Sequence, residues 1–198
     1  MLEKHIENVK TFGITPIVAI NKFGTDSQEE IDFVIQACAK IGINAIVAEG
    51  WEKGGEGMQE LATTVVSCIE NEKNRFAALY DWNAPVIEKI ETIAEKIYGA
   101  DGVDFSKIAK SHLKIISNLG LDHLPICMAK TEKSLSDNPK RIGRPKGFRV
   151  FVREFEVAAG AGFIIPILGK MMRMPGLPST PAFENMFIDK DGKISGLS

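Results

Sequence analysis

Two short apolar runs, each followed by a helical pattern, constrain the fold of this chain more than any other feature. Residues 15–20 read Thr-Pro-Ile-Val-Ala-Ile and residues 44–48 read Asn-Ala-Ile-Val-Ala, and continuous apolar strands are typical of a parallel sheet covered on both faces. A capping box at Ser27 and Glu30 predicts the start of the helix between the two runs. Strands that alternate with helices imply parallel pairing through right-handed crossovers.

The rest of the chain predicts a similar mixture of helices and strands. Apolar residues at helical spacing favour helices at 2–12, 57–72, 85–98 and 106–119. The remaining patterns predict strands at 125–129 and 148–157, an extended segment at 171–178 and a hairpin at 188–194. We expect one α/β domain over residues 1–198, with a mainly parallel or mixed sheet flanked by helices and an extended C-terminal segment.

The composition argues against several kinds of partner. The chain has 24 basic and 26 acidic residues, a formal net charge of -2, so no global attraction to nucleic acid or membrane surfaces is expected. No apolar run approaches the ~20 residues of a membrane span, and the N-terminus lacks the apolar stretch of a signal peptide. We therefore predict a cytoplasmic protein with no nucleic-acid or membrane partner.

Cysteine and histidine spacing gives no indication of a metal site. Cys38, Cys68 and Cys127 form no Cys-x-x-Cys pair and have apolar sequence neighbours, so they are predicted to be reduced core residues. The histidines lack metal-ligand spacing. We predict no metal site and assign no catalytic residue.

An aromatic residue follows each of the two apolar runs. Phe23 comes after the first run and Trp51 after the second, and ligands of open α/β sheets bind outside the carboxyl ends of the strands. Two rings brought to one sheet edge could hold a flat heterocycle, a pterin or a purine, between them. The alternative is that Phe23 fills the top of the core and Trp51 packs over a helix, since packing is the usual role of a single aromatic residue.

Two segments are candidates for binding an anion. Gly54 and Gly55, in a Gly-Gly-Glu-Gly stretch, could let backbone N–H groups approach a carboxylate or phosphate at the start of the next helix, although a flexible surface loop fits the pattern equally well. The concentrated basic region spans 140–153, and a run of charge is usually a solvated face. Arg144 is the best candidate there, because the flanking Gly and Pro constrain its backbone.

Several motifs closely resemble the C-terminal part of formate–tetrahydrofolate ligase, in the same order and over the whole chain. They are Leu-Glu-Lys-His-Ile-Glu-Asn at 2–8, Ala-Ile-Asn-Lys-Phe-x-Thr-Asp at 19–26, Cys-Met-Ala-Lys-Thr-x-x-Ser-Leu-Ser-Asp at 127–137, Ala-Gly-Ala-Gly-Phe at 159–163 and Met-Pro-Gly-Leu-Pro at 174–178. The resemblance implies an ATP-dependent reaction in which formate is phosphorylated to formyl phosphate and the folate amine then displaces phosphate.

The resemblance also implies which residues contact the substrate. In that family, the residues that match Phe23 and Trp51 look like the pair that stacks on the folate ring, with Val47 and Gly24 as neighbours in the pocket. Gly24 departs from the family pattern, in which proline commonly follows the Phe, so the loop is expected to be looser here. ATP and Mg²⁺ belong to a P-loop in an N-terminal region, and no Gly-x-x-x-x-Gly-Lys-Ser/Thr occurs in this sequence.

Two hypotheses for the function follow. In the first, the chain is a fragment of an oligomeric ligase, inactive alone, whose activity requires the N-terminal P-loop region; the uncapped helix at Met1 and Leu2 suggests a cut within a longer fold. In the second, it is a non-catalytic folate- or nucleotide-binding module or a structural assembly domain.

Overall fold

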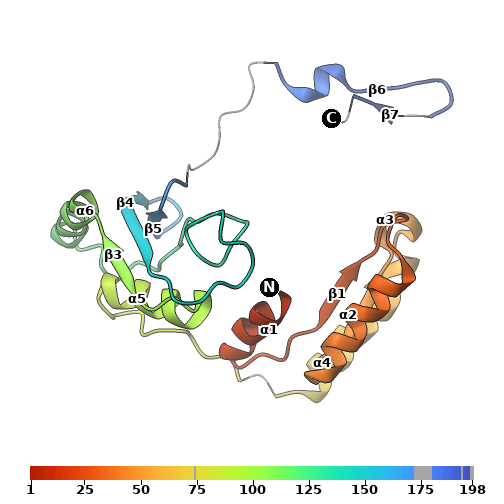
Figure 1. The fold of residues 1–198 in the computed structure, drawn as a ribbon, viewed down its shortest axis with the longest axis horizontal. Coiled ribbons are helices and arrows are strands. Elements are labelled where there is room, and N and C mark those ends of the chain that lie inside the picture. Colours follow the sequence, from red (N-terminus) through yellow and green to blue (C-terminus); the bar gives the residue numbers. More distant parts are fainter. Residues whose placement is uncertain (74, 172–179, 193, 197–198) are drawn as a thin grey trace.

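The computed structural model describes residues 1–73, 75–171, 180–192 and 194–196. Its first part contains two parallel strands with helices packed beside them (Figure 1). The elements are α1 (Leu2–Thr11), β1 (Val18–Asn21), α2 (Gln28–Lys40), β2 (Ala45–Ala48), α3 (Gly50–Lys53), η1 (Glu56–Met58) and α4 (Gln59–Asn71). The predicted parallel pairing is confirmed, with Val18 opposite Ala45 and Asn21 opposite Ala48.

The second part contains a three-stranded mixed sheet. Its elements are α5 (Val86–Thr92), the π-helix η2 (Ile93–Tyr98), β3 (Val103–Phe105), α6 (Lys107–Asn118), β4 (Val150–Ala158) and β5 (Phe163–Leu168). Strand β4 is central, parallel to β3 and antiparallel to β5. The α/β class with parallel and mixed pairing is therefore confirmed, although the described strands belong to three sheets rather than one.

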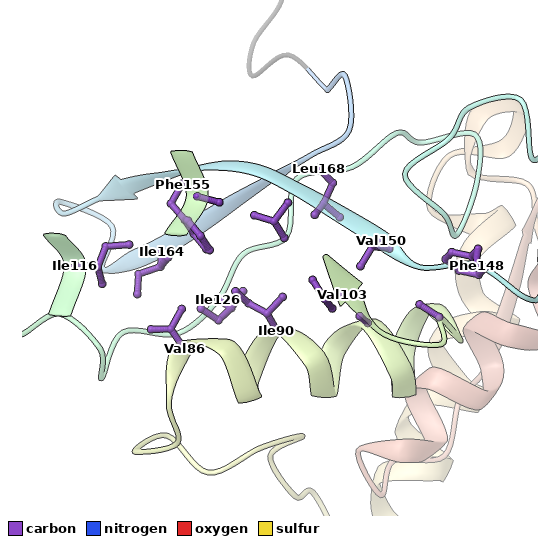
Figure 2. Close-up of a cluster of buried hydrophobic side chains, with 14 residues drawn as sticks. Val86, Ile90, Val103, Ile116, Ile126, Phe148, Val150, Phe155, Ile164 and Leu168 are labelled. Atoms are coloured by element: carbon purple, nitrogen blue, oxygen red, sulfur yellow. The ribbon is translucent and has the colours of Figure 1, made fainter. Parts of the chain in front are cut away.

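The main hydrophobic core lies between this mixed sheet and helices α5 and α6. Figure 2 shows Ile90 of α5 below Val150 and Ile164 of the sheet, and all three are fully buried. A smaller cluster of Ile6, Cys38 and Ile43 packs α1 against α2 and the segment before β2. Because apolar burial stabilises in proportion to the area removed from water, the larger cluster contributes most of the stability.

Helix α1 contacts both parts of the chain. Its Ile6 belongs to the smaller cluster, while Lys4 Nζ donates to the Lys96 carbonyl at 2.7 Å and Asn8 Nδ2 donates to the Ile97 carbonyl at 3.0 Å. These two carbonyls belong to the last turn of η2, where helical carbonyls lack intrahelical partners. Helix α1 therefore joins the parallel sheet to the mixed one.

The predicted strand at 125–129 is only partly formed. Cys127 N–H donates to the Ile164 carbonyl at 2.9 Å, and Ala129 N–H donates to the Pro166 carbonyl at 3.0 Å, but the pairing consists of two isolated bridges. Pro166 has no N–H, so it cannot donate the next ladder hydrogen bond to the Cys127 carbonyl. The Cys127 side chain is exposed, which corrects the prediction of a core cysteine, whereas Cys38 is buried as predicted.

The remaining described residues form a short helix and a hairpin. These elements are η3 (Ala182–Asn185), β6 (Phe187–Ile188) and β7 (Ile194–Ser195), and the two strands pair antiparallel as predicted. Most of the predicted extended segment at 171–178 lies outside the described residues. No helix in the described ranges has the length and apolar character needed to cross a membrane.

Candidate functional site

The structure brings Phe23 and Trp51 together at the carboxyl ends of β1 and β2. Lys22 N–H, just past β1, donates to the Ala48 carbonyl at 3.0 Å, so the two strands end side by side. Phe23 follows directly, and Trp51 lies in the one-turn helix α3 rather than in the predicted loop. The ring centroids are 6.3 Å apart and the ring planes are inclined at 51°. Phe23 is 45% exposed and Trp51 74% exposed, so both rings are accessible to a ligand.

A tight turn holds Phe23 in position. Phe23 N–H donates to the Asp26 carboxylate at 2.8 Å, and Asp26 N–H returns to the Phe23 carbonyl at 3.0 Å. Asp commonly stabilises turns by this kind of bond to nearby backbone N–H groups. Gly24 lies within the turn, and a Cβ added there would meet nothing within 4 Å. The space around Gly24 is therefore open.

An ion-pair cluster links the two exit loops, which we define as residues 22–26 and 49–57. The Glu49 carboxylate accepts from Lys22 Nζ at 2.8 Å and from Lys53 Nζ at 2.5 Å. The hydrogen bond from Lys22, followed by that from Lys53, lowers the pKa of Glu49 from 4.5 to about 2. Lys22 adjoins Phe23, and Glu49 lies two residues before Trp51, so this bridge connects the two loops that carry the rings.

The low pKa of Glu49 gives a testable pH dependence. Because its folded-state pKa lies below the ordinary 4.5, the stability from this carboxylate is fully present above about pH 4.5 and is lost as pH falls through about 2. In a carboxyl-carbon NMR titration we expect Glu49 to titrate near 2. Lys22→Gln should move the midpoint up towards 4.5, whereas Lys133→Gln, in another loop, should leave it in place. A midpoint near 4.5 in the unmodified chain would contradict the bridge.

Gly57 lies against the backbone of Glu49 and leaves no room for a side chain. Glu49 N–H donates to the Gly57 carbonyl at 3.0 Å, and a Cβ on Gly57 would come within 2.5 Å of the Glu49 carbonyl oxygen. A real Cβ does not approach backbone this closely, so the two segments would have to separate. Glycine at position 57 is therefore required for the close approach that places Glu49 between its lysines.

We expect Gly57→Ala to lower the free energy of unfolding by about 1–3 kcal/mol, the usual cost of overpacking. Urea denaturation would measure the change. Gly55→Ala is the matched control, because an added Cβ there meets nothing within 4 Å and the backbone is already helical, with φ -62°; its effect should stay within about 0.5 kcal/mol. Equal losses in the two variants would show that the Glu49 contact is not the cause.

The other predicted site residues lie at or beyond this edge. Val47 is half-buried on β2, opposite Ile20. Gly54 ends α3, with its N–H donating to the Gly50 carbonyl at 3.0 Å, and Gly55 begins the next turn.

Arg144 makes a forked pair with Glu7 of α1, at 2.8 and 2.7 Å, which lowers the pKa of Glu7. Arg144 therefore already has a carboxylate partner.

A model of the formate–tetrahydrofolate ligase family matches residues 1–198 of this chain. The chain belongs to this family. Its members are ligases of one-carbon metabolism that use tetrahydrofolate as a substrate in an ATP-dependent reaction. The match covers every residue of the sequence, so the parallel sheet, the mixed sheet and both exit loops lie within the region that is typical of the ligase.

Sequence reasoning missed the roles of Lys22, Glu49 and Lys53 at this site. All three lie in the motifs around the aromatic residues, in which the sequence pattern points only to the aromatic and glycine residues. The available signal was a pair of opposite charges, Lys22 and Glu49, each immediately after a strand of a predicted parallel pair. Because neighbouring parallel strands end at the same sheet edge, two such charges are expected to lie close enough to form an ion pair.

Proposed function

We propose that Phe23 and Trp51 hold the ring system of tetrahydrofolate, and that this chain forms the folate-binding part of the ligase. The observation that carries the proposal is the meeting of two accessible rings, 6.3 Å apart, at the ends of parallel strands in a chain of this family. Each stacked aromatic face contributes about 1–3 kcal/mol to binding of a flat heterocycle. Val47 and Gly24 are the proposed neighbours of the ring, and the open space around Gly24 gives a ligand access.

The tilted ring pair must open slightly to accept a ligand. A flat ring held between two others lies about 3.5 Å from each, so the outer rings must be about 7 Å apart and nearly parallel. Trp51 is the ring that turns, because it is the more exposed of the two and sits on a single helical turn. The Lys22–Glu49 bridge keeps the backbones of the loops in place during this rotation.

The proposed anion-binding residues differ in whether they already have a partner. Gly54 and Gly55 lie three and four residues after Trp51, with no neighbouring atom within 4 Å of an added Cβ at either position, so a carboxylate or phosphate can approach their backbone. Arg144 contributes only if an anion displaces Glu7 from its guanidinium. Forked binding of carboxylates is typical of arginine, and such an exchange replaces one carboxylate by another.

The phosphate chemistry is assigned to a partner, the N-terminal P-loop region of the ligase. No P-loop motif occurs in this sequence, and phosphoryl transfer depends on positioning by such a loop and Mg²⁺. A groove of about 360 Å³ beside β1, lined by Ile14, Ile17, Val65 and Ile69, supports docking of further protein. Ile69 is 73% exposed there, and exposed apolar clusters of this kind mark interaction surfaces.

Titration of the chain with tetrahydrofolate, followed by calorimetry and tryptophan fluorescence, tests the folate site. We expect saturable binding with a change in Trp51 emission. A folded chain that binds no tetrahydrofolate would overturn the proposal that the pocket is complete in this chain.

We further expect the chain alone to release no ADP in a formate- and tetrahydrofolate-dependent assay. Mixing it with a fragment that contains the P-loop region should restore turnover, since the two halves of the active site would then meet. Turnover by the chain alone would contradict the assignment of the phosphate chemistry to the P-loop region. Folate binding without restored turnover would favour the alternative of a non-catalytic binding module.

A further inference from the structure

A cavity of about 610 Å³ lies between the long loop after residue 129 and the end of β5. The loop contributes Thr131, Asn138 and Lys140 to its wall, and the segment after β5 contributes Gly169, Lys170 and Met171. The volume falls in the range of small-molecule sites. The folate proposal uses none of these residues.

Buried hydroxyl groups hold the loop wall. Ser134 and Ser136 are 0% and 1% exposed, and their hydroxyl oxygens lie 2.9 Å apart. Ser136 N–H donates to Ser134 Oγ at 2.9 Å, and Asn138 N–H donates to Ser136 Oγ at 3.2 Å. Lys130 Nζ donates to the carbonyls of Thr131 and Ser134. The loop has no regular secondary structure here, yet its polar groups are satisfied internally, as in a preformed site.

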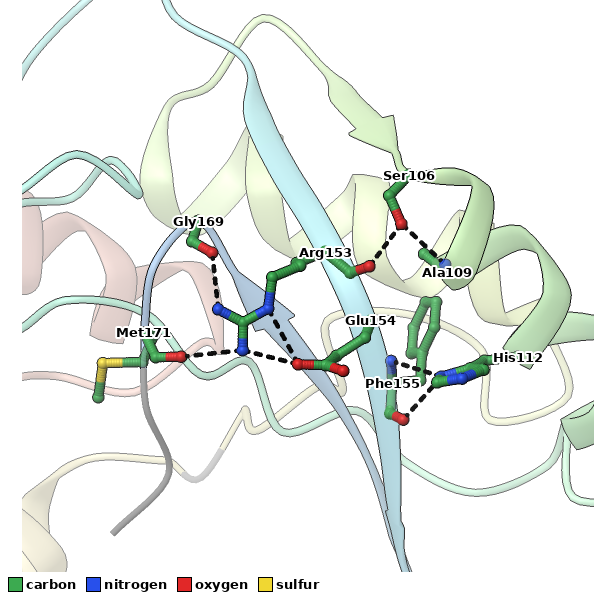
Figure 3. Close-up of polar contacts among 8 residues, drawn as sticks. All are labelled: Ser106, Ala109, His112, Arg153, Glu154, Phe155, Gly169 and Met171. Atoms are coloured by element: carbon green, nitrogen blue, oxygen red, sulfur yellow. Dashed lines mark hydrogen bonds and ion pairs between the residues drawn. The ribbon is translucent and has the colours of Figure 1, made fainter. Parts of the chain in front are cut away.

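The opposite wall is held by Arg153 of β4. Figure 3 shows its guanidinium between the carbonyls of Gly169 and Met171, at 3.2 and 3.3 Å, with Glu154 as its ion-pair partner. Gly169 has φ +53°, and an added Cβ would lie 2.9 Å from the Asp137 carbonyl oxygen. The two walls therefore meet at Gly169, and the bonds of Arg153 hold the segment after β5 beside the loop.

The charges that line this cavity are unbalanced. Lys140 and Lys170 are exposed, and neither ammonium group has an acceptor or an acidic partner among the described residues. Asp137 is the acidic residue in the lining, and its carboxylate accepts from Phe151 N–H at 3.0 Å. Two lysines that line a cavity with the apolar surfaces of Pro139 and Met171 favour a ligand with an anionic head and an apolar body.

We propose that this cavity binds a small ligand through an oxyanion group, phosphate or carboxylate, held by Lys140 and Lys170. The site is separate from the aromatic pair and does not depend on the folate proposal. Thr131 and Asn138 supply polar groups beside the anion, and the fixed walls limit the size of the ligand.

NMR titration of the full chain with pyrophosphate and, separately, with citrate at constant ionic strength tests the site. We expect saturable shifts of the Thr131, Asn138 and Lys170 amides with at least one probe. A response to pyrophosphate alone assigns the ligand to phosphates, and a response to citrate alone assigns it to carboxylates. The absence of saturable shifts with both probes would overturn the proposal.

Charge-matched variants separate a specific site from general attraction. The variant Lys140→Gln with Lys170→Gln should weaken binding by about tenfold or more, since it removes both charge-assisted contacts. The control, Lys110→Gln with Lys114→Gln on α6, removes the same charge from exposed positions and should change the affinity less than about twofold. Equal weakening in both variants would show that the anion responds only to net charge, which would also overturn the proposal.

Discussion

Replacing Trp51 by alanine should weaken tetrahydrofolate binding by roughly 5- to 150-fold. The estimate follows from the ~1–3 kcal/mol that a stacked aromatic face contributes, with each 1.4 kcal/mol equal to a factor of ten. Trp51 is 74% exposed and belongs to neither hydrophobic cluster, so its removal should leave the fold intact. The loss should therefore appear in the dissociation constant measured by calorimetry, with little change in the free energy of unfolding.

The chain offers a matched control for this experiment. Trp82 is 57% exposed and precedes α5, so Trp82→Ala removes the same kind of exposed side chain from a position remote in sequence from the exit loops. Its effect on the dissociation constant should be less than about twofold. Equal weakening by Trp51→Ala and Trp82→Ala would remove the reason for placing the folate ring between Phe23 and Trp51.

Features that depend on nearby residues were predictable from the sequence. The capping box formed in full: Glu30 N–H donates to Ser27 Oγ, and Ser27 N–H donates to the Glu30 carboxylate. Ser106 also caps its helix, because its hydroxyl accepts from Ala109 N–H at 2.9 Å. Gly13, which follows the first helix, has the positive φ that favours glycine just after a helix end. In each case the controlling contacts lie within a few residues.

Features that depend on distant partners were not predictable. The strand at 125–129 is interrupted opposite Pro166, which is about forty residues away in sequence. Pro166 has no N–H, so one hydrogen bond of the ladder is missing. The Arg144–Glu7 pair joins residues 137 positions apart, so a basic run alone could not reveal its partner. The aromatic pair was predictable because parallel pairing of two neighbouring strands was enough to bring the rings together.

A buried lysine is the clearest case in which sequence pattern and structure differ. Lys89 lies on α5 beside the core residue Ile90 and is 0% exposed. Its Nζ donates to the carbonyls of Asp122 and Leu124, at 2.8 and 3.2 Å. Burial lowers the pKa of the ammonium group. The lysine therefore ties the segment after α6 to α5, and it satisfies two backbone carbonyls at the edge of the core.

We expect Lys89→Ala to lower the free energy of unfolding by about 2–5 kcal/mol, because it leaves two carbonyls without their donor and opens a cavity. Lys89→Met keeps most of the volume but supplies no donor, so it should recover only the packing part of the loss. Lys107→Ala, at an exposed position at the start of α6, should change stability by less than about 0.5 kcal/mol. Urea unfolding followed by circular dichroism separates these cases. If Lys89→Met were as stable as the unmodified chain, the two carbonyl bonds would contribute nothing net, and Lys89 would serve the core by its volume alone.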